Sequence, residues 1–283
     1  MQDNNATYRK IADAICPRCQ GELIKAPEQF SCRQCGASYQ VVRNVPILYK
    51  EDHRIIFEPS PVGVELPLKL KLDFLKPMFS LKLPLATRKN LRFLRGKFQD
   101  TDRLLIIGGG MEHYGWFIKE LGQELFNNAV NLEIAPGPFV DLVADAHDIP
   151  FPDNSFDGII CQSVLEHTKD AKRVVAEAYR ILKPGGIIFA EVPFLQPVHM
   201  TSDFRRYTLL GLENLLSDFE KLRSGVNVGT AAAFSMITVY FLSALLSFNS
   251  ERLYRSWKLI FSRSFRTRQV FRPFLVKIFN GHC

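Results

Sequence analysis

The sequence lacks three features that would each assign it to a common class of protein. No segment repeats at a fixed period, so nothing supports a repeat architecture. The spaced G-x-G-x-x-G of nicotinamide-dependent dehydrogenases is absent, which argues against that class of enzyme. No signal peptide precedes the first cysteines, and we therefore expect reduced thiols and a cytoplasmic protein.

The segment from Asp145 to Gly186 alternates apolar strands with a helix. An acidic turn at Asp145 follows the run VDLVA, and the run FDGII leads to Cys161 and Gln162; a helix, Pro-Gly-Gly and another apolar strand come next. This order predicts an α/β fold with a Rossmann-like, doubly wound, mostly parallel sheet. Ligands of such sheets bind at the carboxyl ends of the strands, where this chain has polar loops. An ordinary turn residue is the alternative reading of Asp145.

Three glycines in a row separate an expected strand, residues 103–107, from a helix that begins near His113. Glycine at such a turn lets the backbone approach a bound ligand closely. Glu133 ends the next apolar run, AVNLEI, at about the right distance along the chain to accept hydrogen bonds from both hydroxyls of a ribose. A solvated loop carboxylate is the alternative.

These motifs, above all FPDNSFDGIICQSVLEH and EAYRILKPGGIIFAEVP, resemble the class I S-adenosylmethionine-dependent methyltransferases. The resemblance covers roughly residues 91–224 and is closest to the methyltransferase type 11 group, which includes ubiquinone and menaquinone biosynthesis enzymes. It implies that the glycines line the methionine and ribose end of the cofactor and that Glu133 holds the ribose. It also implies contacts with the adenine and the sulfonium from the later loops. The cofactor-binding residues implied in this way are Gly108, Gly109, Gly110, Glu133, Asp145, Ala146, Cys161 and Gln162.

The glycine loop departs from the pattern of that family. The family has an acidic residue two places before its first glycine and another glycine four places after it, whereas this chain has Ile106 and Glu112. The missing carboxylate would help to hold the ammonium group of the cofactor, and Glu112 is a candidate replacement. A carboxylate favoured by the helix macrodipole is the alternative reading of Glu112.

Two C-x-x-C pairs lie near the amino terminus, twelve residues apart. This spacing predicts a tetrahedral Zn(II) site, with two disulfides or four separate thiols as the alternatives. Four cysteine ligands leave no open coordination position, which indicates a structural metal that supplies much of the folding energy. The module resembles the zinc ribbon of the small activator proteins that support tRNA and protein methyltransferases. The metal ligands predicted here are Cys16, Cys19, Cys32 and Cys35.

We divide the chain into four parts: a zinc ribbon (1–50), a linker rich in proline and in Leu-Lys alternation (51–87), a catalytic domain (88–228) and an extension (229–283). We expect the extension to be helical, with an apolar helix followed by a basic amphipathic segment. Its residues 251–283 hold eight Lys and Arg against one acidic residue, so the net charge of +7 belongs to this tail.

No charged residue occurs in the 27 positions between Arg223 and Glu251, which include the apolar segment 230–248. Three readings of this segment stay open: burial against the sheet, attachment to an anionic membrane surface, and a transmembrane span. We expect no nucleic acid partner, because the basic tail is also rich in Phe, Leu and Ile.

The segment VPFLQPVHMTSDFRRYT follows the fifth strand and concentrates groups suited to catalysis. His199 is the candidate general base or substrate contact, with a loop histidine bound to backbone as the alternative. Asp203 is the second catalytic candidate, to orient His199 or bind a substrate hydroxyl, with a helix cap as its alternative. The leading hypothesis is O-methylation of a small molecule, glycan or lipid-linked envelope precursor near the cytoplasmic membrane. An isoprenoid-quinone C-methyltransferase and a catalytically silent, cofactor-binding scaffold are the alternatives.

Overall fold

The computed structural model describes residues 4–50, 85–109, 114–195 and 202–227, five residues between 234 and 245, and strand residues 273–278. Side chains are described within these ranges except for residues 4–6, 85–86, 114–117 and 273–278.

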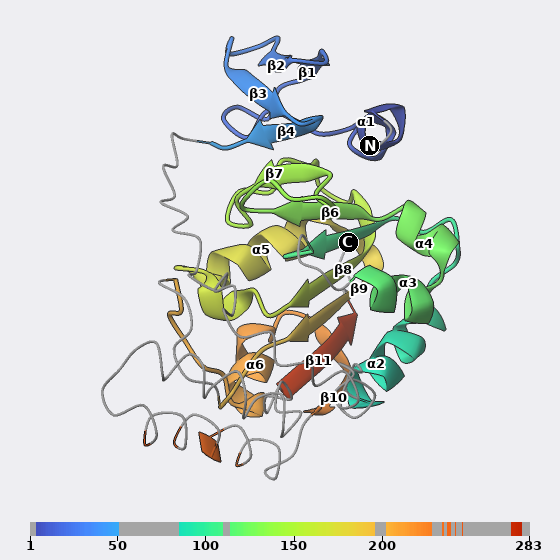
Figure 1. Ribbon diagram of the computed structural model, residues 1–283, viewed down its shortest axis with the longest axis vertical. Helices are drawn as coiled ribbons and strands as arrows, with labels where there is room; N and C mark the ends of the chain where they lie inside the picture. The colour runs from blue at the N-terminus through green and yellow to red at the C-terminus, as the bar shows by residue number, and fades with distance from the viewer. Residues whose placement is uncertain are drawn as a thin grey trace, which may run out of the picture.

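Strands from the whole chain form one sheet in the order β1-β2-β3-β4-β7-β6-β5-β8-β9-β11-β10 (Figure 1). The strands are β1 Leu23–Lys25, β2 Gln29–Cys32, β3 Ser38–Val42, β4 Val45–Leu48, β5 Leu104–Ile107, β6 Val130–Glu133, β7 Leu142–Ala144, β8 Phe156–Gln162, β9 Leu182–Glu191, β10 Glu220–Val226 and β11 Pro273–Ile278. Neighbours from β4 to β9 are parallel, and the other pairs are antiparallel. The predicted Rossmann-like, mostly parallel sheet is confirmed.

Helices cover both faces of the parallel strands (Figure 1). They are α2 Leu85–Arg95, α3 Tyr114–Leu121, α4 Gln123–Asn127, α5 Ala171–Ile181 and α6 Leu209–Leu215, with a 3-10 helix at Leu165–His167. Helix α1, Asn4–Lys10, lies with the ribbon (Figure 1). Strand β5 is buried along its length, and its alternate side chains enter two different clusters: Leu105 packs with residues of α5 and α6, and Leu104 with residues of α2 and α4. Such uninterrupted burial is typical of parallel strands between two helical layers.

The ribbon docks on the edge of the catalytic sheet. Strand β4 pairs in parallel with β7, and the two modules share one apolar cluster that includes Phe30 and Leu48 from the ribbon. Next to the amino end of β5, the Arg103 guanidinium donates to both carboxylate oxygens of Asp13 (2.5 and 2.6 Å) and lies 4.5 Å from the ring centroid of Phe156. The ribbon and the sheet are therefore joined by strand pairing and by this separate ion pair.

Residues 273–278 differ from the expectation for the carboxyl-terminal extension. This segment forms β11, which lies antiparallel between β9 and β10 and so belongs to the catalytic sheet. A six-residue apolar run fits a strand as well as a helical face, and the periodicity of so short a run does not separate the two. Helix α2 likewise begins at Leu85, inside the expected linker.

Of the apolar segment 230–248, the structure describes residues 234, 237, 238, 241 and 245, all in helical conformation. Among the described residues, no helix combines the length and the apolarity needed to cross a membrane. The arginine-rich stretch 251–272 lies outside the described residues.

Candidate cofactor site and cysteine cluster

The parallel strands bring the predicted cofactor residues to one edge of the sheet. Ile107 of β5 pairs with Leu132 of β6 and with Cys161 of β8, and Glu133 pairs with Val143 of β7. Parallel strands in this register place their carboxyl ends together, so the loops after β5, β6, β7 and β8 surround one space. Gly108, Glu133, Asp145 and Gln162 are gathered there, as the sequence predicts. We call this end of the parallel strands the cofactor edge.

Gly108 follows β5 with a φ of 79° and donates its N–H to the Leu132 carbonyl at 2.9 Å. A Cβ at this position would lie 2.2 Å from Cγ2 of Val164, which belongs to the loop after β8. Glycine is therefore needed both for the backbone conformation and for the close approach of two cofactor loops. Gly109 is buried, while Gly110 and Glu112 lie outside the described residues, so their assigned roles stay predictions.

The two acidic residues of the edge are both partly exposed and held by nearby donors. Glu133 accepts a hydrogen bond from the N–H of Ile134 at 3.1 Å. Asp145 accepts from the backbone N–H of His147 at 2.9 Å, and its Oδ1 lies 2.5 Å from His147 Nδ1. The Asp170 N–H donates to His147 Nε2 at 3.1 Å, so the ring proton lies on Nδ1 and points at Asp145. His147 is not among the site residues predicted from the sequence, although it lies only two residues from Asp145.

Cys161 lies at the end of β8 and is buried. Burial, with a smaller contribution from the Glu166 carboxylate, raises the pKa of the Cys161 thiol above its usual range. The thiol stays protonated at neutral pH, which favours a packing role over a nucleophilic one; its predicted place beside the sulfonium stays a prediction.

A buried polar network supports Gln162. Its Nε2 donates to Glu191 Oε1 at 3.3 Å, and the Glu191 side chain also accepts from Thr87 Oγ1 at 3.4 Å and from Asn227 Nδ2. Asn90 Nδ2 in turn donates to Asn227 Oδ1 at 2.7 Å. The network joins α2, β8, β9 and the end of β10 beneath the cofactor edge. Glu191 is not among the residues predicted from the sequence, because its partners are far apart along the chain.

The loop expected to contact the acceptor lies beside the loop after β8. Phe204 N–H donates to the Glu166 carbonyl at 2.9 Å, and His167 Nδ1 lies 3.1 Å from the Ser202 carbonyl oxygen. The Asp203 side chain is fully buried and accepts hydrogen bonds from both terminal nitrogens of Arg206. Asp203 is thus fixed in an ion pair, which fits positioning of this loop.

The helix-cap alternative for Asp203 is wrong for α6. The N-cap of that helix is Thr208, whose Oγ1 accepts from the Gly211 N–H at 3.0 Å. His199 lies outside the described residues, and its role as general base stays a prediction.

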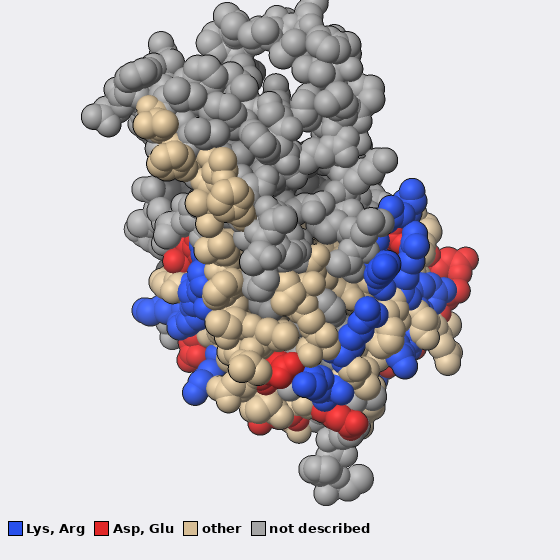
Figure 2. All heavy atoms as spheres, turned by 90° about the horizontal axis from the view of Figure 1, so that it is seen from below, with Lys and Arg blue, Asp and Glu red and all other residues tan. Residues whose placement is uncertain are grey.

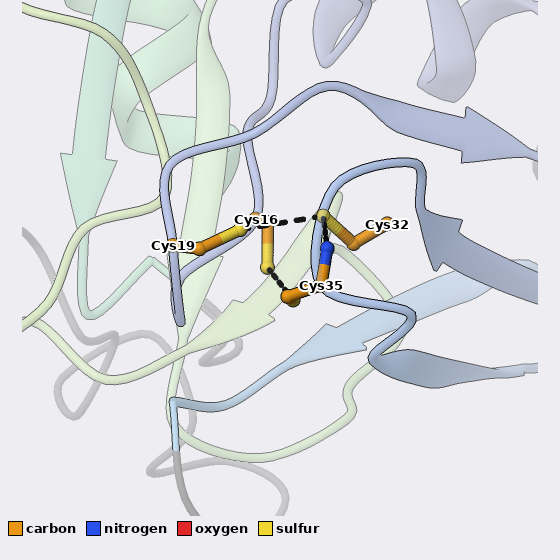
Figure 3. Close-up of side chains that lie close together, drawn as sticks. All are labelled: Cys16, Cys19, Cys32 and Cys35. Carbon is orange, nitrogen blue, oxygen red and sulfur yellow. Dashed lines mark hydrogen bonds between the residues drawn. The ribbon is translucent and has the colours of Figure 1, made fainter.

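The four cysteines of the ribbon converge on one point (Figure 3). Their Sγ atoms all lie within 4.8 Å of one another, with 3.7 Å between Cys16 and Cys35 and 3.4 Å between Cys19 and Cys32. The edges of a tetrahedron with Zn–S bonds of about 2.3 Å measure about 3.8 Å, so this cluster fits a zinc ribbon.

Backbone N–H groups of Cys35 and Gln34 point at the Cys32 sulfur and lower the pKa of its thiol to about 6. For Cys19, a hydrogen bond with the Gly21 backbone lowers the pKa, but burial and the three other thiols outweigh it and raise the pKa to about 12. The positions of the four sulfur atoms therefore carry the fit to a metal.

Comparison with known proteins identifies the class of the domain. Residues 114–190, from α3 to the end of β9, match the methyltransferase domain family Methyltransf_11. The matched segment contains Glu133, Asp145 and Gln162. The chain therefore carries an S-adenosylmethionine-dependent methyltransferase domain, as the sequence motifs indicate.

Among curated proteins, the chain is 40% identical over 57 residues to the demethylmenaquinone methyltransferase of Symbiobacterium thermophilum, which covers 19% of this chain and 23% of that protein. It is 36% identical over 70 residues to the ubiquinone/menaquinone biosynthesis C-methyltransferase of Psychromonas ingrahamii, covering 24% and 28%. The match thus spans about a quarter of each relative's length. Among solved structures, phosphoethanolamine N-methyltransferase 2 of Haemonchus contortus is similar with a TM-score of 0.46 and 15% identity over 69% of this chain and 52% of that one.

Proposed function

We propose that this protein transfers a methyl group from S-adenosylmethionine to an oxygen of a small molecule, glycan or lipid-linked envelope precursor, at the inner face of the cytoplasmic membrane. The observation that carries the proposal is the common edge formed by Gly108, Glu133, Asp145 and Gln162. The cofactor supplies an electrophilic methyl group at its sulfonium. The protein has to align the acceptor with that methyl group and remove the proton of the acceptor hydroxyl.

We assign proton removal to His199, because it precedes by three residues a described segment, residues 202–206, that contacts the loop after β8. The Phe204 N–H and the Arg205 guanidinium donate hydrogen bonds to that loop. The Asp203–Arg206 ion pair lies within the segment. An imidazole with a pKa of about 6.5 accepts a proton near neutral pH. The proton of the acceptor hydroxyl would pass to the ring nitrogen as the methyl–oxygen bond forms.

Exposed apolar side chains support a membrane-associated acceptor. Phe234, Ile237, Phe241 and Leu245 are 71, 43, 62 and 60% exposed, and their spacing of three, four and four residues places them on one helical face. Figure 2 shows the face seen from below, where Lys and Arg side chains, with Asp and Glu among them, lie on both sides of uncharged residues. An exposed apolar helical face suits attachment to a membrane surface, and the exposure of these four residues favours this reading over burial against the sheet.

C-methylation of an isoprenoid quinone is the second candidate. The names of the curated relatives favour it, and a quinone acceptor also suits an apolar surface. The two candidates differ in the acceptor atom and therefore in the product.

For the ribbon, we propose that Cys16, Cys19, Cys32 and Cys35 bind a structural Zn(II). Four thiolates close the tetrahedron, so the metal would stabilise the fold and take no part in methyl transfer.

The proposed function is tested first by calorimetry with S-adenosylmethionine and then by transfer of radiolabelled methyl to membrane lipids and glycans from cells that lack the protein. We expect cofactor binding in the micromolar range, a labelled, alkali-resistant methyl ether, and loss of binding in Glu133→Ala. A labelled quinone would instead support the second candidate, C-methylation, and would overturn O-methylation. No cofactor binding at millimolar concentration would overturn both.

A further inference from the structure

The last residues of the ribbon reach the cofactor edge of the catalytic sheet. Strand β4 runs parallel to β7, with Leu48 level with Ala144, so the residue after Leu48 arrives beside the loop after β7. That residue is Tyr49. Its hydroxyl donates a hydrogen bond to the backbone carbonyl of Ile134, which directly follows Glu133.

Tyr49 also lies near both acidic residues of the cofactor edge. Burial raises the pKa of its phenol to about 12, and the carboxylates of Asp145 and Glu133 contribute to the same direction. The phenol therefore keeps its proton under all working conditions and remains a donor to Ile134. Tyr49 is half-buried, between the loop assigned to the ribose and the loop assigned to the adenine.

The neighbouring residue makes a second contact with the adenine-side loop. Lys50 Nζ lies 3.0 Å from Asp148 Oδ1, and the Asp148 N–H donates to the Asp145 carbonyl at 3.0 Å. Arg173 Nη2 donates to the same Asp148 oxygen at 2.5 Å. The ribbon thus contacts the loops after β6 and β7 through two consecutive side chains.

We propose that the ribbon completes the cofactor site, with Tyr49 as a positioning residue. Its hydroxyl fixes the carbonyl of Ile134 and thereby the neighbouring Glu133 carboxylate. Lys50 holds the Asp145 loop through Asp148, and together these contacts keep the arrangement that receives the nucleoside half of the cofactor. Residues of the catalytic sheet alone would leave these two loops without this link. The inference rests on the proposed cofactor binding.

The test compares S-adenosylhomocysteine affinity, measured by calorimetry, in the wild-type protein and in Tyr49→Phe. The substitution removes one hydroxyl and keeps the ring, so the protein should still fold. Loss of one hydrogen bond that orders a binding loop should raise the Kd by about three- to tenfold. Tyr8→Phe is the matched control, because Tyr8 also belongs to the ribbon and donates to a backbone carbonyl, that of Pro27 at 3.3 Å, away from the cofactor edge.

A merely structural role would change the melting temperature and not the affinity. We expect Tyr49→Phe and Tyr8→Phe to have similar melting temperatures, and only Tyr49→Phe to bind more weakly, with the same loss for adenosine as for S-adenosylhomocysteine. Equal affinity of Tyr49→Phe and wild type would overturn the inference and leave the proposed function intact. An equal loss in Tyr8→Phe would also overturn it. A wild-type protein that binds no S-adenosylhomocysteine would instead overturn the proposed function itself.

Discussion

The ribbon and the catalytic sheet bury their apolar residues by different means. Ribbon strand β3 alternates exposed and covered side chains, whereas β5 of the catalytic sheet is buried at every position. The ribbon therefore has one apolar face and little core of its own, and its fold depends on the cysteine cluster and on contact with β7. The sheet is packed between two helical layers, and the ribbon contributes to its stability mainly by covering the edge strand β7.

The largest expected effect comes from removing a cysteine of the cluster. In Cys32→Ser the ribbon should lose its metal and unfold locally, because bound zinc supplies on the order of 10 kcal/mol in small ribbons and fingers. The parallel strands β5, β6, β8 and β9 should stay folded. Elemental analysis gives the zinc content, and hydrogen exchange of residues 14–48 gives the local unfolding.

Cys161→Ala is the control for that experiment, since Cys161 is a buried thiol outside the cluster. It should keep its zinc and its protected ribbon. Loss of zinc with unchanged exchange in Cys32→Ser would mean that the ribbon does not rely on the metal, and the contrast with the sheet would disappear.

The next effect lies in the sheet and concerns Gly108. In Gly108→Ala the new Cβ would meet Cγ2 of Val164 at 2.2 Å, in a backbone conformation that already costs an L-residue about 1–2 kcal/mol. We expect cofactor affinity to fall by at least about tenfold and unfolding free energy to fall by about 2–4 kcal/mol. Calorimetry and urea unfolding measure the two effects.

Gly185→Ala separates collision from backbone strain. Gly185 has a φ of 80°, nearly the same as Gly108, but a Cβ there meets nothing within 4 Å. It should cost only the strain of about 1–2 kcal/mol and leave cofactor binding unchanged. If both variants bind the cofactor equally well, the loops after β5 and β8 do not need their close approach.

A smaller effect is expected where the two regions meet. Arg103→Met removes the paired hydrogen bonds to Asp13 and the contact with the ring of Phe156, while it keeps most of the apolar stem. We expect a loss of about 1–3 kcal/mol in unfolding free energy, with faster hydrogen exchange in α1.

Arg33→Met is the comparison variant for the interface, because its ion pair with Glu22 lies within the ribbon and both side chains are mostly exposed. Such a pair contributes little, about 0–1 kcal/mol. Equal stability of the two variants would show that Arg103 contributes no more to docking than an exposed pair within the ribbon.

The sequence predicted the cofactor edge better than the surroundings of that edge. Gly108, Glu133, Asp145 and Gln162 each follow or end a strand, and both the apolar run and the polar residue after it are local patterns. The cysteine spacing is local in the same way. Tyr49 gave no such signal, because its partner Ile134 is 85 residues away and only the β4–β7 pairing brings them together.

Two further features, the contacts of Glu191 and the strand at residues 273–278, also depend on residues far apart in the sequence. Glu191 ends β9, and only the fold brings to it Thr87 of α2 and Asn227, the residue after β10. The local pattern of segment 273–278 fits a strand or a helix, and its pairing with β9 and β10 makes it a strand. Local periodicity does not encode such long-range contacts, so the sequence pattern predicted neither feature.

The smallest expected effect tests whether ion pairs in the helices that cover the sheet contribute to the stability of the catalytic domain. Glu120 is buried, which by itself raises the pKa of its carboxyl, but hydrogen bonds from Arg88 and Arg92 at 2.6 Å outweigh burial and lower it. A carboxyl whose pKa is lowered on folding stabilises the protein at pH values above its unfolded pKa of about 4.3. That stabilisation is lost as the pH falls through the folded-state pKa.

Glu120→Gln should lower the free energy of unfolding by about 1 kcal/mol at pH 7, because Arg92 is mostly exposed. It should also flatten the acid side of the curve of stability against pH, below about pH 5. Urea unfolding from pH 7 to pH 4 measures this, with Glu124→Gln, an exposed glutamate of α4, as the control. If Glu120→Gln and wild type lose stability in parallel on acidification, the acid sensitivity of the protein belongs to the ribbon and its thiolates, and the two regions differ in electrostatics as well as in burial.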